Sequence, residues 1–172
     1  MSQQHPFSRP VRLHQVGVGV TRVLEADEAE RKAIARWLDL QAVDAFSTEL
    51  TLAPAEFGWL LKGRVKAEVI QRCGLTLTPL PATVDEAFTV RLVEADEAGG
   101  GEVEVSLEDD GADVIEGGQI DLGHHAVEQL SLALDPFPRA PGAEFVQPEE
   151  SAEISPFAVL KGLRTGGDAS ET

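Results

Sequence analysis

The stretch LLKGRVKAEVIQRCGLTLTPL, residues 60–80, carries the clearest strand pattern in the chain. Its odd-numbered positions from 61 to 73 are apolar or small, apart from one glutamine, while the even-numbered positions hold its charges. These charged residues are Lys62, Arg64, Lys66, Glu68 and Arg72. Side chains alternate between the two faces of a strand, so one face is expected to pack into a core and the other to carry the charges. Such a basic stripe is either neutralised by acids on neighbouring strands, such as Glu49, or kept for a partner.

The chain around this stretch is strongly acidic, and its charge is uneven. It has 172 residues and a net charge of −16, of which residues 1–72 contribute +1 and residues 73–172 contribute −17. A surface this negative repels nucleic acid unless the bases gather on one side, whereas it attracts basic proteins without such grouping. Aromatic residues make up 5% of the chain and Tyr is absent, so platforms for stacking single-stranded bases are scarce.

Several classes of protein are disfavoured by what the sequence lacks. No apolar run approaches the roughly 18 residues of a membrane-spanning helix, and the N-terminus has no apolar signal segment. The single cysteine, Cys73, lies on the apolar parity of its strand, which predicts a buried, inert thiol without a disulfide. No nucleophile elbow, phosphate loop or metalloprotease motif occurs. We therefore expect a cytoplasmic protein that is not an enzyme and that has no metal or cofactor.

Other strand patterns flank the basic stripe. Apolar and polar side chains alternate in residues 43–53 and again in residues 83–95. The run 7–24 also reads as extended, and its Gly17 and Gly19 indicate a strand with a close backbone neighbour. Strands that follow one another with short connections favour antiparallel pairing. The expected fold class is α+β, with an antiparallel β-sheet or open barrel-like meander and two or three packed helices.

The first predicted helix follows Asp27, which with Glu30 has the spacing of a capping box. Its expected apolar stripe consists of Ala29, Ala33, Ile34, Trp37 and Leu38, with Leu40 as a candidate sixth member. Three bases, Arg31, Lys32 and Arg36, lie off that stripe. We interpret them as a solvated face, with a basic contact surface as the alternative.

A second helix is predicted within residues 119–134, with Asp121 as its N-cap. His124 and Glu128 have the spacing of two metal ligands on one helical face, but no further ligand can be assigned, so we interpret them as solvated neighbours. Arg139 follows in a proline-rich segment and is either a structural ion pair or a contact point for a ligand. A deep pocket lined by His124, His125, Glu128 and Arg139 would favour a small-ligand carrier or an enzyme.

The domain organisation follows from composition. We expect one α+β domain over residues 1–148, a linker and short docking helix over 149–163, and a disordered tail over 164–172. Within the domain, residues 94–118 are rich in acids and glycine and are expected to form a solvated acidic loop with short strand-like pieces.

Seven short sequence segments resemble the YceD-like family. They are Gln71-Arg72-Cys73 with the following Leu77-Thr78-Pro79-Leu80 and Val84–Phe88; Ile120–Gly123; Glu128–Leu130 with Leu132–Arg139; and Pro156–Leu160. The similarity spans roughly residues 60–163, and the run PFPRAPGAEF is similar to the alphaproteobacterial branch. Many members carry a second cysteine near the first, which is missing here, so a metal or redox role is not expected for Cys73.

The resemblance implies a non-catalytic ribosome-biogenesis factor that supports accumulation of large-subunit ribosomal RNA. It does not supply binding residues, so the candidates come from charge and position: Lys62, Arg64, Lys66, Arg72 and Arg139. In one version these bases contact ribosomal RNA phosphates. In the other, the acidic loop binds a basic ribosomal protein. The sequence indicates no membrane partner and no oligomeric state.

Overall fold

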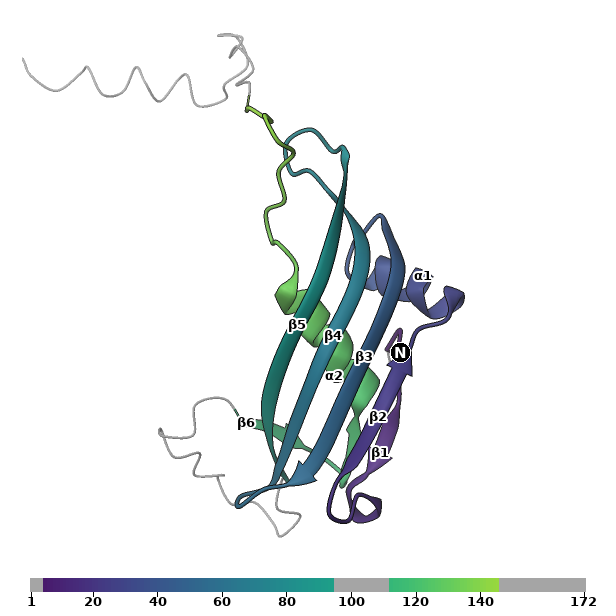
Figure 1. The fold of residues 1–172 in the computed structure, drawn as a ribbon, viewed down its shortest axis with the longest axis vertical. Helices are drawn as coiled ribbons and strands as arrows, with labels where there is room; N and C mark the ends of the chain where they lie inside the picture. Colours follow the sequence, from purple (N-terminus) through teal and green to yellow (C-terminus); the bar gives the residue numbers. More distant parts are fainter. Residues whose placement is uncertain (1–4, 95–111, 146–172) are drawn as a thin grey trace, which may run out of the picture.

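The computed structural model describes residues 5–94 and 112–145. The elements are β1 (Pro10–Arg12), η1 (Leu13–Gln15), β2 (Val20–Glu25), α1 (Glu28–Trp37), β3 (Ala42–Pro54), β4 (Trp59–Arg72), β5 (Pro79–Glu94), β6 (Ala112–Ile115), β7 (Gln119–Asp121) and α2 (Leu122–Ala133). The main sheet has the order β2-β3-β4-β5-β6, and β1 pairs with β7 separately. Its neighbouring strands are antiparallel except β5 and β6, which are parallel. The sheet does not close (Figure 1), so the predicted α+β class is confirmed.

β4 is the centre of the main sheet and follows the predicted alternation. Leu61 and Val65 are fully buried, and β4 pairs with β3 on one side and β5 on the other. Between them lies Gly63, where an added Cβ would come 2.6 Å from Leu50 and 2.7 Å from Phe88. The absent side chain therefore lets side chains from both neighbouring strands meet over β4.

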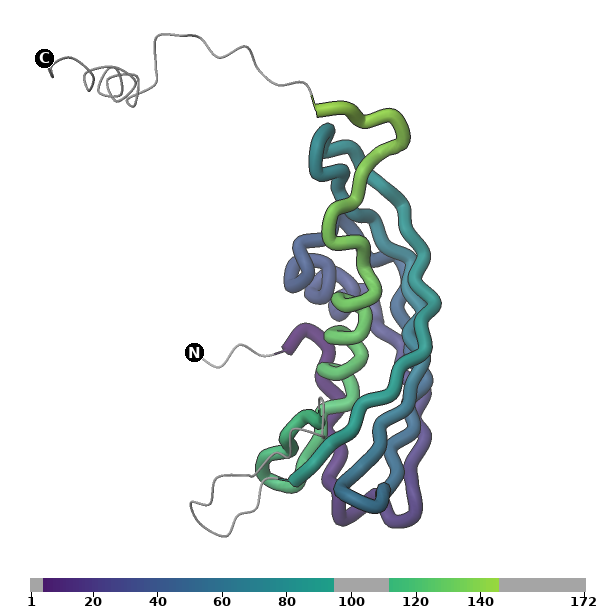
Figure 2. The backbone as a smooth tube through the Cα atoms, turned by 90° about the vertical axis from the view of Figure 1, so that its left-hand side faces the viewer, coloured from purple at the N-terminus to yellow at the C-terminus, as the bar shows by residue number. Residues whose placement is uncertain are grey.

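Both helices cover the same face of the sheet, so the described part of the molecule has two layers (Figure 2). α2 begins at Asp121, whose carboxylate accepts hydrogen bonds from the backbone N–H groups of Gly123 and His124. This confirms the predicted N-cap. The other face of the sheet is covered by no described helix, and we call it the open face. It bears the even-numbered side chains of β4.

α1 begins with the predicted capping box: Asp27 accepts from the backbone N–H of Glu30, and the Glu30 side chain accepts from that of Asp27. The predicted apolar stripe is partly wrong. α1 buries Ile34 and its neighbour Ala35, whereas Ala29 is exposed and Trp37 is 43% exposed. The helix packs mainly against one strand, β3, so only a narrow strip of its surface is covered.

The prediction of one extended run over residues 7–24 is wrong. β1 ends at Arg12, a 3₁₀ turn follows, and a loop that includes Gly17 and Gly19 leads to β2. Both glycines have positive φ, 61° and 145°, which a residue with a side chain rarely adopts. Val18 between them is 97% exposed. The alternation of valine and glycine thus mimics the period of a strand while the glycines make a turn.

Some predictions fall on residues outside the described ranges. Most of the acidic loop predicted over 94–118 does, although its strand-like piece at Val114 and Ile115 forms part of β6. The predicted docking helix over 149–163 and the predicted tail over 164–172 also lie outside the described residues.

Candidate nucleic-acid interface

The basic stripe of β4 lies on the open face. Lys62, Arg64 and Lys66 are exposed there, and they share this face with Thr51 of β3 and Thr89 of β5. The stripe is therefore placed where a partner could reach it. The predicted parity of all its members, including Glu68 and Arg72, is observed.

Acids on the neighbouring strands partly neutralise this stripe. Glu49 lies directly opposite Arg64 in the β3–β4 register, and the Arg64 guanidinium forms an ion pair with Asp85 of β5. The hydrogen bond from Arg64 holds the pKa of Asp85 below its ordinary value. Lys66 faces Asp85 across the strands, whereas Lys62 faces two threonines. Arg64 is therefore neutralised within the sheet, whereas Lys62 has no acid in register.

The end of β4 is joined to the segment that follows α2. Gln71 Nε2 donates a hydrogen bond to the backbone carbonyl oxygen of Asp135, with 2.9 Å between the two atoms. The backbone N–H of Gly74 donates to the carbonyl oxygen of Pro138, with 2.8 Å between nitrogen and oxygen. We call residues 71–74 together with 135–140 the clasp. Both arginines that the clasp contains, Arg72 and Arg139, are exposed. Two of the predicted site residues are therefore brought to the same end of the molecule, although they are far apart in sequence.

Cys73 lies inside the clasp and is fully buried, as predicted. Its surroundings are more polar than those of an inert core thiol. Sγ accepts the N–H of Ala140 at 3.2 Å and the N–H of Thr76 at 3.4 Å. Hydrogen bonds, first from the Thr76 side chain and then from Ala140, lower the pKa of Cys73 to about 6 although burial opposes this. The sulfur thus serves as an acceptor that holds the clasp together.

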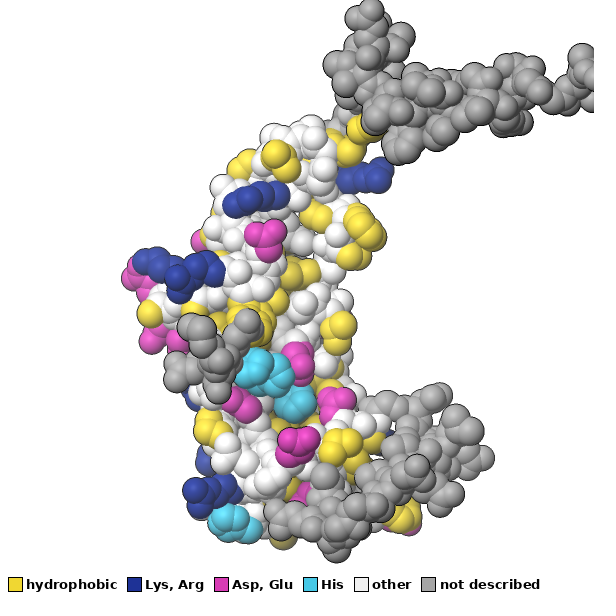
Figure 3. Space-filling view, turned by 180° about the vertical axis from the view of Figure 1, so that it is seen from behind, with side chains coloured by type: hydrophobic (Ala, Val, Ile, Leu, Met, Phe, Trp, Pro, Cys, Tyr) yellow, Lys and Arg dark blue, Asp and Glu magenta, His cyan; other side chains and the backbone are white. Residues whose placement is uncertain are grey.

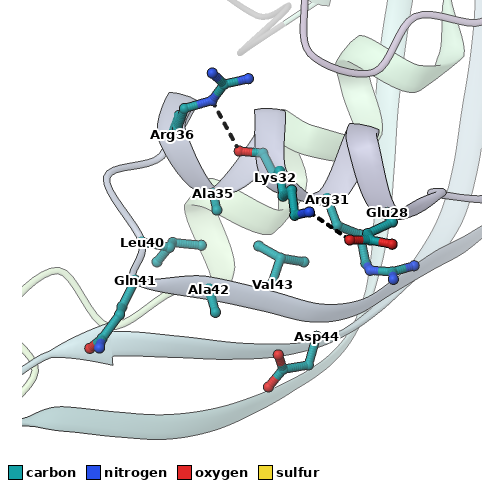
Figure 4. Close-up of a pocket in the computed structure, with 10 residues that line it drawn as sticks. All are labelled: Glu28, Arg31, Lys32, Ala35, Arg36, Leu40, Gln41, Ala42, Val43 and Asp44. Atoms are coloured by element: carbon teal, nitrogen blue, oxygen red, sulfur yellow. Dashed lines mark hydrogen bonds and ion pairs between the residues drawn. The ribbon is translucent and has the colours of Figure 1, made fainter.

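A groove lies between α1 and the start of β3, with a volume of about 740 Å³. Ala35, Leu40 and Val43 line its apolar part, while Arg31, Lys32 and Arg36 come from α1 (Figure 4). Lys32 forms an ion pair with Glu28, Arg31 donates to the carbonyl oxygen of Ala26, and Arg36 donates to that of Lys32. From the sequence we interpret these three bases as a solvated face. The bases can be identified in the sequence, but the groove beside them cannot, because the start of β3 forms its other side.

A second hollow, of about 380 Å³, lies beside the clasp. Leu40 lines both hollows, and Arg72, Asp135 and Pro138 line the second. We define the basic end of the molecule as Arg31, Lys32, Arg36, Arg72 and Arg139. Figure 3 shows Lys and Arg side chains over α1 and near the top of the helix-bearing side. One exposed aromatic side chain, Phe137, lies in the clasp, while Trp37 at the end of α1 is 43% exposed and has its ring 5.4 Å from that of His5.

The histidines of α2 form a separate cluster. His124 Nε2 lies 3.0 Å from one Glu128 oxygen, and His125 Nδ1 lies 3.2 Å from the other. The His5 ring lies 3.7 Å from that of His124, and burial lowers the pKa of His125. None of the pockets seen among the described residues is lined by these histidines, Glu128 and Arg139 together. Within residues 5–94 and 112–145, no group of three His, Cys, Asp or Glu side chains is arranged to hold a metal ion.

One comparison with known proteins identifies a family. The family model described as large ribosomal RNA subunit accumulation protein YceD matches residues 61–164, which is more than half of the chain. No curated protein and no solved structure matches. The matched region contains both sides of the clasp, whereas α1 and its groove precede it.

Proposed function

The chain belongs to the YceD family, and we propose that it is a non-catalytic ribosome-biogenesis factor supporting accumulation of large-subunit ribosomal RNA. The family description supports a ribosome-related role. The absence of a catalytic motif in the sequence is compatible with a factor that acts by binding. The alphaproteobacterial branch remains a prediction from the run PFPRAPGAEF.

We propose that ribosomal RNA is the direct partner and that the basic end contacts its phosphates. The observation that carries this proposal is that four of the five bases of the basic end line two hollows that share Leu40, while Arg139 follows Pro138 of the second hollow. The described residues hold 12 Lys and Arg against 18 Asp and Glu, a net charge of −6, so the described body is far less negative than the whole chain. Phe137 is 78% exposed in the clasp and supplies a face on which a nucleic-acid base can stack. Lys62 and Lys66 on the open face are a secondary contact, because Arg64 is already paired.

Cell fractionation tests this function. The tagged chain is purified from its own cells, and the extract is separated on a sucrose gradient. We expect the protein to migrate with precursors of the large subunit and to recover large-subunit ribosomal RNA. A protein found only in the free fraction would contradict the proposal. Recovery of a bound metabolite instead would favour the alternative of a small-ligand carrier or enzyme.

A basic ribosomal protein is the second candidate partner, and the charge distribution favours it. Residues 1–4, 95–111 and 146–172 together carry a net charge of −10, most of it within 95–111. A chain in which residues 96–110 are replaced by a neutral linker tests this version. It should no longer retain basic ribosomal proteins in a pull-down, whereas unchanged retention would exclude the loop as their binding site.

We also propose a cytoplasmic location, which a ribosome-related role favours. Among the described residues, no helix is long and apolar enough to span a membrane.

A further inference from the structure

Within residues 5–94 and 112–145, one edge of the main sheet has no partner strand over most of a long strand. β5 spans Pro79–Glu94, but β6 pairs only with Arg91–Glu94. No other described strand lies on that side of β5, so residues 79–90 form a free edge (Figure 1). A free edge presents backbone donors and acceptors that can pair with another chain.

The register of β5 determines which backbone groups point to this edge. β4 and β5 pair without a bulge, so the alternation of backbone groups is continuous along β5. Pro79 and Pro81 have no backbone N–H to donate. The N–H of Cys73 donates to the carbonyl oxygen of Thr78, so even-numbered residues face β4. Odd-numbered residues therefore face away from β4. The complete pairs of N–H and C=O groups at the free edge belong to Thr83, Asp85, Ala87 and Thr89.

On the helix-covered face of residues 84–90, the side chains beside this edge are apolar except at one position. On the helix-covered face, Val84 is buried and Phe88 and Val90 are half-buried. Glu86 has the same parity but is exposed, and no described base forms an ion pair with it. Asp85, on the open face, is already paired with Arg64. Glu86 is therefore the carboxylate that an added strand would meet.

A second copy of the chain is a poor occupant of this edge. If two β5 edges paired antiparallel about Glu86, the two Glu86 carboxylates would face each other, and like charges directly opposite are destabilising. The prolines at 79 and 81 block two of the hydrogen bonds that a longer pairing would need. Both features disfavour self-pairing centred on Glu86, while residues 83–89 remain able to bind a strand of different charge.

We propose that the free edge of β5 binds an extended basic peptide as an additional strand. Backbone hydrogen bonds to residues 83–89 hold the peptide, a Lys or Arg lies opposite Glu86, and apolar side chains pack beside Val84 and Phe88. This mode requires alternating side chains in the partner, which distinguishes it from nonspecific attraction to an acidic surface. The proposal is independent of RNA binding at the basic end.

Binding of synthetic peptides tests this proposal on the full chain. The probe alternates Val with Thr and carries Lys in place of the central Val; the control peptide carries Glu there. We expect the peptide to change the NMR chemical shifts of backbone amides at the β5 edge only. The Lys peptide should bind at least about fivefold more tightly than the Glu peptide. Equal binding of both peptides, binding of neither, or shifts on another surface would overturn the proposal.

Two protein variants make the test specific. Glu86→Lys leaves the backbone unchanged and should reverse the preference, so that the Glu peptide binds better. Ala87→Pro removes one N–H from the edge and should abolish binding, whereas Ala87→Val keeps it and should retain binding. Should Ala87→Pro fail to fold, the reversal by Glu86→Lys decides the matter alone. An unchanged preference in Glu86→Lys, or a dimer whose β5 amides are protected in the absence of peptide, would contradict the proposal.

Discussion

The basic stripe of β4 and the basic end of the molecule carry the same kinds of side chain in different settings. In the stripe, regular strand pairing places Glu49 and Asp85 beside Arg64. At the basic end, three elements from distant parts of the sequence surround hollows that are lined by apolar, basic and acidic side chains together. The comparison teaches that a row of bases in a sheet is easily neutralised by acids on the neighbouring strands. At the basic end Lys32 also pairs with Glu28, but Arg36, Arg72 and Arg139 form no ion pair within the described residues.

The largest expected effect concerns the apolar wall of the basic end. Leu40 is 9% exposed and lines both hollows, so Leu40→Ala should lower the free energy of unfolding by about 2–3 kcal/mol. Leu77→Ala is the matched control, because Leu77 is 72% exposed, and it should change stability by less than about 0.5 kcal/mol. Urea unfolding measures both. Equal effects would mean that the groove has no packed wall.

The next effect concerns the thiol in the clasp. The pKa of Cys73 is lowered to about 6 in the folded chain, below its ordinary value of 9.0, so folding favours the thiolate. The resulting stabilisation is complete above the unfolded pKa and is lost as the pH falls through 6. Stability should therefore rise between pH 6 and 9 more steeply in the natural chain than in Cys73→Ala.

The difference between these two chains isolates the thiol, because His125, whose pKa burial lowers, contributes a rise of the same sign in both. Parallel stability curves over pH 6 to 9 would show that the sulfur does not act as a charged acceptor in the clasp.

A smaller effect is expected for the side-chain hydrogen bond of the clasp. Gln71→Ala removes the donor to the Asp135 carbonyl oxygen and should cost about 1 kcal/mol. Gln41→Ala is the control, since Gln41 is exposed and its side chain makes no hydrogen bond within the described residues. Denaturant unfolding compares them. A cost for Gln41→Ala as large as that for Gln71→Ala would remove the basis for the clasp.

The smallest effect is expected in the stripe. The Arg64–Asp85 pair is about half exposed, and exposed ion pairs contribute little because water and salt screen them. A double-mutant cycle with Arg64→Ala and Asp85→Ala should give a coupling energy smaller than the costs of Leu40→Ala and Gln71→Ala. This coupling energy should decrease further in high salt. A coupling as large as the cost of Gln71→Ala, unchanged by salt, would mean that the stripe is chiefly structural.

Local patterns in the sequence were sufficient to predict much of the fold. The alternation in β4, the capping box at Asp27 and the N-cap at Asp121 each depend on residues close in sequence, and each is observed. The prediction of one extended run over residues 7–24 is wrong because the alternation of residue types does not reveal the positive φ of Gly17 and Gly19.

The candidate site was less predictable, because its parts meet only in the folded chain. Arg72 and Arg139 were identified by charge, but their proximity follows from hydrogen bonds between the two sides of the clasp. The groove beside Arg36 depends on how α1 lies over β3, which no spacing in the sequence specifies. Pairing of Arg64 with Asp85, rather than with Glu49 in register, likewise depends on side-chain direction.

The most direct test measures how salt weakens binding of a large-subunit ribosomal RNA fragment by two variants that each lose three charges. One variant carries Arg36→Ala, Arg72→Ala and Arg139→Ala in the basic end; the other carries Lys62→Ala, Arg64→Ala and Lys66→Ala in the stripe. Each lost phosphate contact reduces the slope of log K against log salt by about 0.7–0.9. We predict a reduction of about 2 or more for the basic end and the smaller reduction for the stripe. An equal or larger reduction for the stripe, or none for the basic end, would contradict the account.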